Sequence, residues 1–444
     1  MSEGLRVAVV GAGPAGIYAA DRLVKDVPGV RVDLLERLPA PFGLIRYGVA
    51  PDHPRIKGIV GALHRVLAQP QVRLVGNVEY GVDVDLEMLR RHYDAVVFAT
   101  GAVRDRPLRV RGSDLPGSYS SAEFVSWYDG HPDGPRSWPL HADKVAVIGM
   151  GNVALDAARM LAKSADELAH TEIPDHVYDG LAANAASEVH VFGRRGPAQA
   201  KFSPLELREL DESPTIDVVV DPGDMVYDEA SVAARAASKI TDQVAGLIEE
   251  YAARGSRGRA RKLVLHFFEE PVEILSEDGA VVGLRTERTE LDGTGNAKGT
   301  GRFTEWPVQA VYRAIGYLSD ELPGLPFDHR RGVVPNEAGR VEQMTGVYVT
   351  GWVRRGPVGL IGHTRSDSAE VVAALIADHR AGLLPHRPGG DLVETLDRAA
   401  HPYTTWDGWQ RLDAHERGLG AQRGRERTKV VERADMLAAS RALP

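Results

Sequence analysis

The first hydrophobic segments of the chain alternate between strand-like runs and a helix-like spacing. Residues 5–10 form a short apolar run rich in β-branched side chains, which is typical of a buried parallel strand. Apolar residues then recur at helical spacing, at Ile17, Ala20, Leu23 and Val24. A second apolar run covers residues 30–35 and ends in Glu36. The pattern predicts a strand, a helix and a second strand, as in a parallel α/β sheet.

The turn between the first strand and the helix is rich in glycine and reads Gly11-Ala12-Gly13-Pro14-Ala15-Gly16. Gly11 permits a tight turn, Gly13 lets the backbone approach a pyrophosphate, and Gly16 lets helix and strand pack closely. Free N–H groups and the dipole at the helix N-terminus favour an anion there. Glu36 stands twenty residues after Gly16 and is placed to accept hydrogen bonds from an adenosine ribose. Together these features predict a dinucleotide site rather than a purely structural turn.

The same pattern recurs 138 positions later, counted from Gly11 to Gly149. Residues 144–148 predict a strand, residues 149–154 read GxGxxA, and a helix is expected over 152–163. The next predicted strand, 188–193, ends in Arg194 and Arg195 instead of an acid. Arginines there favour a 2′-phosphate through bidentate, charge-assisted hydrogen bonds, which indicates NADP(H) over NAD(H). A solvated arginine pair is the alternative.

The remaining elements of the first part follow simple patterns. Residues 37–54 are too rich in Pro and Gly for regular structure and too apolar for a mobile linker, so we expect an ordered loop over a cofactor. A helix is expected over 54–68, and strands over 72–78 and 93–102. Residues 103–140, rich in Pro, Gly and Arg, suggest a crossing between domains.

In the second half, residues 164–187 read as a polar insertion and 231–254 as a charged surface helix. Short alternating segments predict a small antiparallel meander, at 263–268, 272–275, 281–287 and 302–308. Two further strands are expected at 309–316 and 346–352. Asp367 is the expected cap of a helix that runs to His379. The last 60 residues read as charged and mostly helical.

Composition narrows the possible chemistry. The chain has 444 residues, 43% hydrophobic, with a net charge of −9, which argues against general affinity for nucleic acid or anionic membranes. It has no cysteine, which excludes disulfides, thiolate metal sites, iron–sulfur ligation and a redox-active Cys pair. Electrons would therefore have to leave a flavin directly, and no metal site is expected. The first strand begins by residue 5 and no apolar run reaches membrane-spanning length, so a cytoplasmic protein is expected.

Several further residues are candidates for the site. Trp352 precedes a third glycine-rich stretch, Gly359-Leu360-Ile361-Gly362, whose N–H groups could lie along a flavin; a core aromatic and an ordinary turn are the alternative. His53 could tune a flavin or shuttle a proton, or be structural. Glu206 could meet the nicotinamide end or its ribose, although composition favours a solvated helix face.

A basic cluster stands out in this acidic chain: Arg254, Arg257, Arg259, Arg261 and Lys262. Such a cluster could steer an acidic partner, but a solvated loop is the commoner outcome for a charge run.

By these residues the chain resembles the adrenodoxin reductase family, including its bacterial ferredoxin–NADP reductase members. The resemblance covers most of the chain in order, through VAVVGAGPAG, LLERLPAPFGLIRYGVAPDHPRIK, GNVEYG, YDAVVFATGA, VIGMGNVALDAARML, VFGRRGPAQAKF, LELREL, YRAIGY and TGWVRRGPVGLIGH. The family's fold is similar to that of glutathione reductase, but the family carries Gly-Trp, here Gly351-Trp352, where relatives carry Gly-Asp.

Carried over by position, the resemblance implies FAD contacts at Ala15, Glu36, Leu44, Tyr80, Trp352, Gly359, Leu360 and Ile361. It implies NADP contacts at Met150, Gly151, Asn152, Val153, Arg194, Arg195, Glu206 and Gly359. His53 matches the family's flavin-site histidine. Ala15 stands where some members carry serine, and Tyr80 where others carry valine. Family members pass electrons singly to a small acidic iron–sulfur protein, often serving a cytochrome P450.

We therefore expect an α/β protein with two Rossmann-like dinucleotide-binding domains, the NADP domain being inserted in the FAD domain. The expected FAD domain covers 1–102 and 318–444, and the NADP domain 103–317. The function hypothesis is an NADPH-dependent, FAD-containing reductase that passes electrons to a ferredoxin. The alternatives are a flavin enzyme that reduces or oxygenates a small organic substrate, and a non-catalytic cofactor-binding subunit. The sequence does not indicate the oligomeric state.

Overall fold

The computed structural model describes residues 4–53, 58–358, 361–386 and 390–441. The chain divides into two compact units. The first unit contains the chain up to Arg104, a short return at Asp129–Asp133, and everything from Tyr317 onward. The second unit contains Asp105–Tyr128 and Gly134–Gly316. The return at Asp129–Asp133 has no signal in the sequence pattern, because only its contacts assign it to the first unit.

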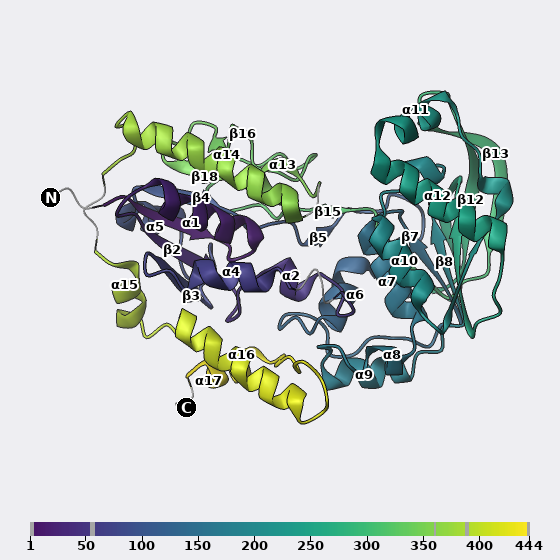
Figure 1. The fold of residues 1–444 in the computed structure, drawn as a ribbon, viewed down its shortest axis with the longest axis horizontal. Coiled ribbons are helices and arrows are strands. Elements are labelled where there is room, and N and C mark those ends of the chain that lie inside the picture. The colour runs from purple at the N-terminus through teal and green to yellow at the C-terminus, as the bar shows by residue number, and fades with distance from the viewer. Residues whose placement is uncertain (1–3, 54–57, 359–360, 387–389, 442–444) are drawn as a thin grey trace. The chain divides into compact units, whose positions relative to one another are not determined.

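The first unit is built on a seven-stranded sheet (Figure 1). Its strand order is β16 (Asn336–Glu337), β17 (Arg340–Val341), β18 (Val347–Val349), β4 (Ala95–Phe98), β1 (Arg6–Val10), β2 (Arg31–Glu36) and β3 (Val72–Gly76). The five strands from β18 to β3 run parallel, and β16 and β17 are antiparallel additions at one edge. The parallel strands are almost fully buried because helices cover both faces.

One face of this sheet packs against a core that includes α1 (Pro14–Asp26), α4 (Val60–Leu67), α14 (Ile361–Arg380), α16 (Trp406–Ala421) and α17 (Arg433–Arg441). The other face packs on α5 (Leu86–His92) and α15 (Leu392–Arg398). Two one-turn helices, α2 (Leu44–Tyr47) and α13 (Trp352–Arg355), lie in loops, and β5 (Arg104–Asp105) pairs with β15 (Tyr317–Leu318).

The second unit has a six-stranded parallel sheet in the order β6 (Ser118–Ser120), β14 (Ala310–Arg313), β7 (Lys144–Ile148), β8 (Glu188–Phe192), β10 (Arg261–His266) and β9 (Ile216–Val220). Its α-helices are α6 (Ser121–Tyr128), α7 (Asn152–Ala162), α8 (Ala165–Leu168), α9 (Asp175–Ala182), α10 (Pro204–Glu212), α11 (Glu229–Ala237) and α12 (Lys239–Arg254). Short 3₁₀ turns lie at η1 (Pro197–Gln199) and η2 (Pro222–Asp224). An antiparallel sheet of β11 (Glu269–Glu277), β12 (Ala280–Leu291) and β13 (Ala297–Trp306) completes the unit.

The structure confirms the expected α/β class and corrects four details. The segment expected to open the meander is β10, which pairs in parallel between β8 and β9; the meander itself consists of β11, β12 and β13. The single helix expected over 231–254 is two, broken at Ser238, whose side chain accepts from the Thr241 N–H. The polar insertion 164–187 contains α8 and α9, which bury Leu168, Val177 and Leu181. Finally, Asp367 lies inside α14 and caps nothing there. Within the part of the chain described, no helix combines the length and apolarity that crossing a bilayer requires.

The contact between α1 and the end of β1 gives a stability prediction. A Cβ added at Gly16 would lie 1.9 Å from the backbone oxygen of Gly11, and a backbone oxygen cannot move aside cheaply. We expect Gly16→Ala to lower the free energy of unfolding by ~3 kcal/mol, measured by urea unfolding with tryptophan fluorescence. Gly61→Ala in α4 is the control, since a Cβ there meets no described residue within 4 Å; it should raise stability by ~0.5–1 kcal/mol. A Gly16→Ala protein as stable as the parent would contradict the close contact.

Candidate functional site

The first glycine-rich turn joins β1 to α1 as the sequence predicts. Gly11 has a φ of +109°, and a Cβ there would lie 2.5 Å from the Ala99 carbonyl oxygen, so only glycine fits. Helix α1 begins at Pro14 after Gly13, and no side chain caps its N-terminus. The first N–H groups of an α-helix lack acceptors within the helix, so this uncapped start offers donors to an anion.

The middle glycine of each turn differs from its neighbours in having room beside it. Among the residues that the structure describes, a Cβ at Gly13 would approach only the Cα of Gly43, at 3.9 Å, and a Cβ at Gly151 would meet nothing within 4 Å. By contrast, Cβ atoms at Gly11, Gly16 and Gly149 would each clash with a backbone oxygen. Packing therefore explains three of the glycines but not Gly13 and Gly151. Open backbone beside a helix start is what a diphosphate needs, and the two turns fit dinucleotides.

Glu36 is held at the end of β2 by two main-chain donors. Its carboxylate accepts hydrogen bonds from Ala12 N at 2.9 Å and Leu38 N at 3.1 Å, and the side chain is buried. Burial raises the pKa of Glu36, while the hydrogen bonds from Ala12 and Leu38 oppose this rise. The two bonds orient the carboxylate beside the glycine turn, and each oxygen keeps a further lone pair for a ribose hydroxyl.

Leu44 and Trp352 are also brought near the first glycine turn. Phe42 N donates to Ala12 O at 2.8 Å, and the next residue, Gly43, lies against Gly13 immediately before Leu44. A Cβ at Gly351 would lie 2.8 Å from the Ala15 Cβ, which places Gly351-Trp352 beside the start of α1.

Asp367 of α14 holds Gly351-Trp352 beside the start of α1. It accepts hydrogen bonds from the Gly351 N–H and the Thr350 hydroxyl, at 2.5 and 3.0 Å, and Ser368 donates to Ala15 O at 2.9 Å. Sequence reasoning missed this role, since it treated Asp367 as a helix cap. The predicted contacts Gly359 and Leu360 lie outside the described residues, and Ile361 begins α14.

Two other predicted residues of the first unit have well-defined surroundings. The Tyr80 hydroxyl donates to Pro323 O at 2.5 Å, and its ring meets Phe98 edge-on at 4.8 Å between centroids. The pKa of Tyr80 is raised to about 12, mainly by burial, so the phenol is neutral at physiological pH. His53 is almost fully buried, at 2% exposure, where the ordered loop ends.

The second glycine turn, in the second unit, is tied to the start of α10. Lys201 N donates to Met150 O at 2.8 Å, and Ser203 N donates to the Asn152 side chain at 2.9 Å. Val153 follows in the half-buried first turn of α7. The Met150 side chain packs so closely on Gly193 that a Cβ there would lie 2.2 Å from its Cγ. This contact brings the turn against the end of β8, where Arg194 and Arg195 follow.

Arg194 and Arg195 form a concentrated positive charge. The Arg194 side chain is 65% exposed and reaches Glu270 only at 3.6 Å. The guanidinium of Arg195 has no carboxylate partner among the described residues, and its pKa is lowered by burial and by the charge of Arg194. Two adjacent guanidinium groups that repel each other favour an added anion such as a 2′-phosphate.

Glu206 does not lie on a solvated helix face, which corrects the expectation from composition. It is 3% exposed in the first turn of α10, where Ser203 caps the helix. Its carboxylate accepts from Arg159 at 3.3 Å, and Arg159, fully buried on α7, also donates to Asp156 at 2.9 Å. Arg159 was missed by sequence reasoning, because one buried arginine on a helix gives no local signal.

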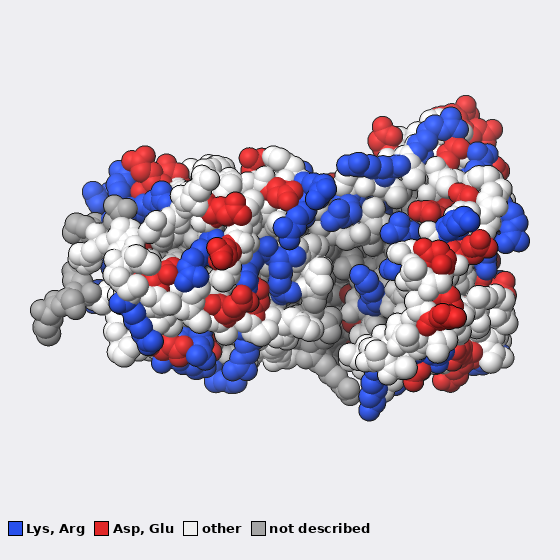
Figure 2. Space-filling view, turned by 90° about the horizontal axis from the view of Figure 1, so that it is seen from above, with Lys and Arg blue, Asp and Glu red and all other residues white. Residues whose placement is uncertain are grey.

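The basic cluster at 254–262 includes a partly exposed loop, as expected, but most of its arginines also bind groups of the second unit. Arg254 and Arg257 pair with Asp211 at 2.8 and 3.0 Å. Arg259 donates to three main-chain oxygens around the start of β9, and Arg261 donates to further carbonyls. Figure 2 shows basic and acidic side chains interspersed over the face that it draws. These arginines therefore connect the end of α10, β9 and neighbouring loops of the second unit through ion pairs and hydrogen bonds.

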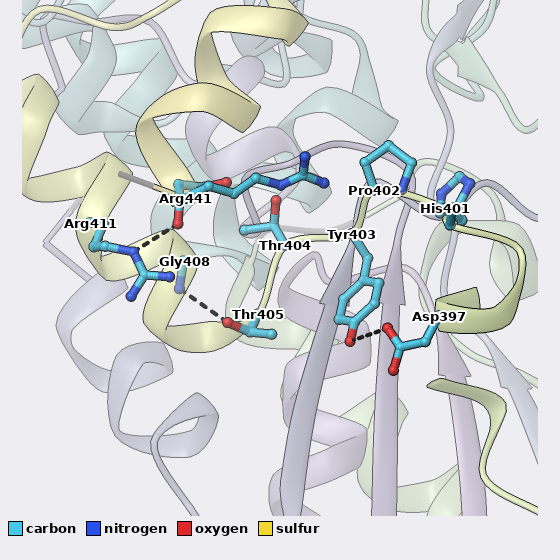
Figure 3. A pocket seen from close by; sticks show the side chains of 11 residues that line it. Asp397, His401, Pro402, Tyr403, Thr404, Thr405, Gly408, Arg411 and Arg441 are labelled. Atoms are coloured by element: carbon cyan, nitrogen blue, oxygen red, sulfur yellow. Dashed lines mark hydrogen bonds between the residues drawn. The ribbon is translucent and has the colours of Figure 1, made fainter. Parts of the chain in front are cut away.

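A pocket of about 400 Å³ lies in the first unit, between the loop before α16 and the end of α17 (Figure 3). Thr404, Arg411 and Arg441 are among its lining residues, and the Tyr403 hydroxyl donates to Asp397 at 3.0 Å. None of the predicted site residues that the structure describes lines it. The pocket therefore gives no reason to move the candidate site away from the glycine turns.

Comparison with known proteins places the chain in a family. It is 40% identical to "NADPH-ferredoxin reductase FprA" of Mycobacterium leprae, over 97% of both chains. The chain belongs to the NADPH-ferredoxin reductase and adrenodoxin reductase family. Another member of this reductase family, the mitochondrial "NADPH:adrenodoxin oxidoreductase" of Arabidopsis thaliana, is 37% identical over 99% of this chain and 96% of its own.

Solved structures agree with this family assignment. The structure of Mycobacterium tuberculosis FprA in complex with NADPH matches with a TM-score of 0.91 at 39% identity, over 99% of this chain and 100% of that one. A broader family model, "Pyridine nucleotide-disulphide oxidoreductase", matches residues 5–192. This chain cannot carry out the disulphide chemistry that the name of this broader family refers to, because it has no cysteine.

The basic cluster gives a testable consequence. We expect Arg259→Met to lower the free energy of unfolding by ~2 kcal/mol, because the three main-chain carbonyls of Asp211, Ser213 and Ile216 lose a charged donor. Lys262→Met is the matched control: its side chain is 52% exposed and 3.5 Å from Glu188, so stability should change by less than ~0.5 kcal/mol. Thermal or urea unfolding measures both variants. If the Arg259→Met and Lys262→Met proteins are equally stable, the hydrogen bonds of Arg259 do not stabilise the fold.

Proposed function

We propose that this protein is an NADPH-dependent flavoprotein reductase that passes electrons from NADPH through FAD to a ferredoxin-type iron–sulfur protein. One observation carries the proposal. The chain holds two glycine turns with open middle glycines, one followed by buried Glu36 and the other by Arg194 and Arg195. The two turns thus suit dinucleotides of opposite ribose chemistry, and the full-length relatives are named NADPH-ferredoxin and adrenodoxin reductases.

We assign FAD to the first unit. Gly11, Gly13, Ala15 and Gly16 form the diphosphate turn, and Glu36 holds the adenosine ribose. Leu44, Tyr80, Trp352 and the start of α14 at Ile361 line the remainder, together with Gly359 and Leu360 outside the described residues. When bound, FAD supplies a centre that accepts a hydride and releases electrons to a one-electron acceptor. His53 is assigned to the flavin end, where a buried imidazole can hold or pass a proton.

We assign NADP(H) to the second unit. Met150, Gly151, Asn152 and Val153 offer the backbone of the second turn to its diphosphate. Arg194 and Arg195 bind the 2′-phosphate, and Glu206, oriented by Arg159, faces the ribose or nicotinamide end. The domain limits 1–102 with 318–444, and 103–317, and a cytoplasmic location, remain predictions from the sequence.

A turnover assay tests the function. Purified protein with FAD should oxidise NADPH with ferricyanide, and should reduce cytochrome c only when a ferredoxin is added. NADPH oxidation that requires a small organic compound would support a reductase or monooxygenase of that compound instead. Flavin binding without any turnover would support a non-catalytic subunit. The readouts are NADPH absorbance and cytochrome c reduction.

The coenzyme assignment gives a separate prediction. Arg194→Ala/Arg195→Ala should raise the KM for NADPH about 100-fold, ~2.7 kcal/mol, by removing charge-assisted hydrogen bonds to the phosphate. The KM for NADH should stay nearly constant, because NADH has no 2′-phosphate. Arg302→Ala, which removes one exposed arginine from β13, controls for the loss of a single positive charge from the surface. If the preference for NADPH does not shift, the 2′-phosphate site lies elsewhere.

A further inference from the structure

The C-terminal part of the first unit lies against the loop that approaches the first glycine turn. We call residues 404–441 the C-terminal arm; it contains α16 and α17, yellow in Figure 1. The loop in question is 42–47, which holds Gly43 against Gly13 and carries Leu44. The arm and this loop are about 370 positions apart in sequence and belong to the same unit.

The loop has a strained backbone that its surroundings must hold. Phe42 has a φ of +85°, which is unfavourable for a residue with a large side chain, and Gly43 follows at +49°. Strain of this kind persists only where neighbouring contacts over-determine the conformation. The one-turn helix α2, which forms the second part of this loop, has no side-chain cap at its start. The conformation of this loop therefore depends on groups outside it.

The arm supplies a buried ion pair to this loop. Glu416 of α16 is fully buried and accepts a hydrogen bond from the Arg46 guanidinium at 2.5 Å, and the Arg46 side chain is 4% exposed. The same carboxylate accepts from Val430 N at 2.9 Å and from Arg427 at 3.3 Å. Removing one partner of such a pair leaves a buried charge uncompensated, which is strongly unfavourable.

The arm also contacts the main chain and the aromatic side of the loop. The Lys429 ammonium, 1% exposed, donates to Arg46 O at 2.7 Å and to Asp129 O at 3.0 Å. The Trp409 ring meets Phe42 edge-on, with centroids 5.5 Å apart. Phe42 in turn donates its N–H to Ala12 O in the glycine turn. A continuous series of contacts thus runs from the arm through the loop to the backbone beside Gly13.

We propose that the C-terminal arm is a positioning element of the FAD site, with Glu416 and Lys429 as its positioning residues. The arm holds loop 42–47 in the conformation that FAD requires, so docking of the arm and binding of FAD stabilise each other by linkage. Both residues act through Arg46, and Trp409 of the same arm contacts Phe42. This inference rests on the proposed function only in that FAD is the ligand of the first unit.

Hydrogen exchange on the unmodified full-length protein tests the coupling. We compare the protein with FAD and after removal of FAD. Binding should slow amide exchange in 42–47 and also in α16 and residues 427–430, while α15, on the other face of the sheet, should change little. Protection of 42–47 without any change in the arm would overturn the inference and leave the proposed function standing. Absence of FAD binding would overturn both.

Two variants separate positioning from general stability. Glu416→Gln should weaken FAD binding at least tenfold in a fluorescence titration. Asp391→Asn is the matched control: Asp391 pairs with Arg73 at 2.6 Å and joins α15 to the same sheet without touching loop 42–47. FAD affinity should then change less than threefold. If FAD affinity falls equally in both variants, the arm contributes only general stability, and the inference is overturned. If Glu416→Gln does not fold, Lys429→Met is judged by the same comparison.

Discussion

The structure depends on a close backbone approach at the end of the strand that precedes each glycine turn. A Cβ at Gly11, after β1, would lie 2.5 Å from the Ala99 carbonyl oxygen, and a Cβ at Gly149, after β7, would lie 2.2 Å from that of Ala314, so only glycine fits at either place. This approach points the uncapped helix start at the space beside Gly13 and beside Gly151. The same backbone constraint, used once in each unit, creates two places where main-chain donors face an anion.

The two places differ through the groups at the end of the neighbouring strand. Glu36 is buried and held by main-chain N–H groups, so it presents acceptor oxygens to a neutral ribose. Arg194 reaches Glu270 only at 3.6 Å, Arg195 has no carboxylate partner among the described residues, and the two charges repel each other, so the pair favours an anion such as a phosphate. In the proposed assignment, the difference in cofactor follows from local electrostatics on a shared backbone, which is why fold alone would not distinguish the sites.

The local features were predictable from the sequence, because they are encoded within about thirty consecutive residues. Strand and helix periodicity and the glycine spacing place β1, α1, β7 and α7 correctly. Features that depend on distant partners were not predictable. Nothing in residues 263–268 shows that they pair between β8 and β9, and nothing near Asp367 shows that it receives the Gly351 N–H. Which residues contact the cofactors stays a prediction.

Buried charges show the same limit and explain its physical basis. Arg46, Arg159 and Glu416 look like surface residues in the sequence, yet each is nearly or fully buried with a partner from another element. Such a pair gains little net stability over an apolar contact, but leaving one partner alone is costly. A buried ion pair therefore determines which elements pack against each other more than it adds to the stability of that packing. In the first unit, that specificity joins the last helices of the chain to the strained loop beside its first glycine turn.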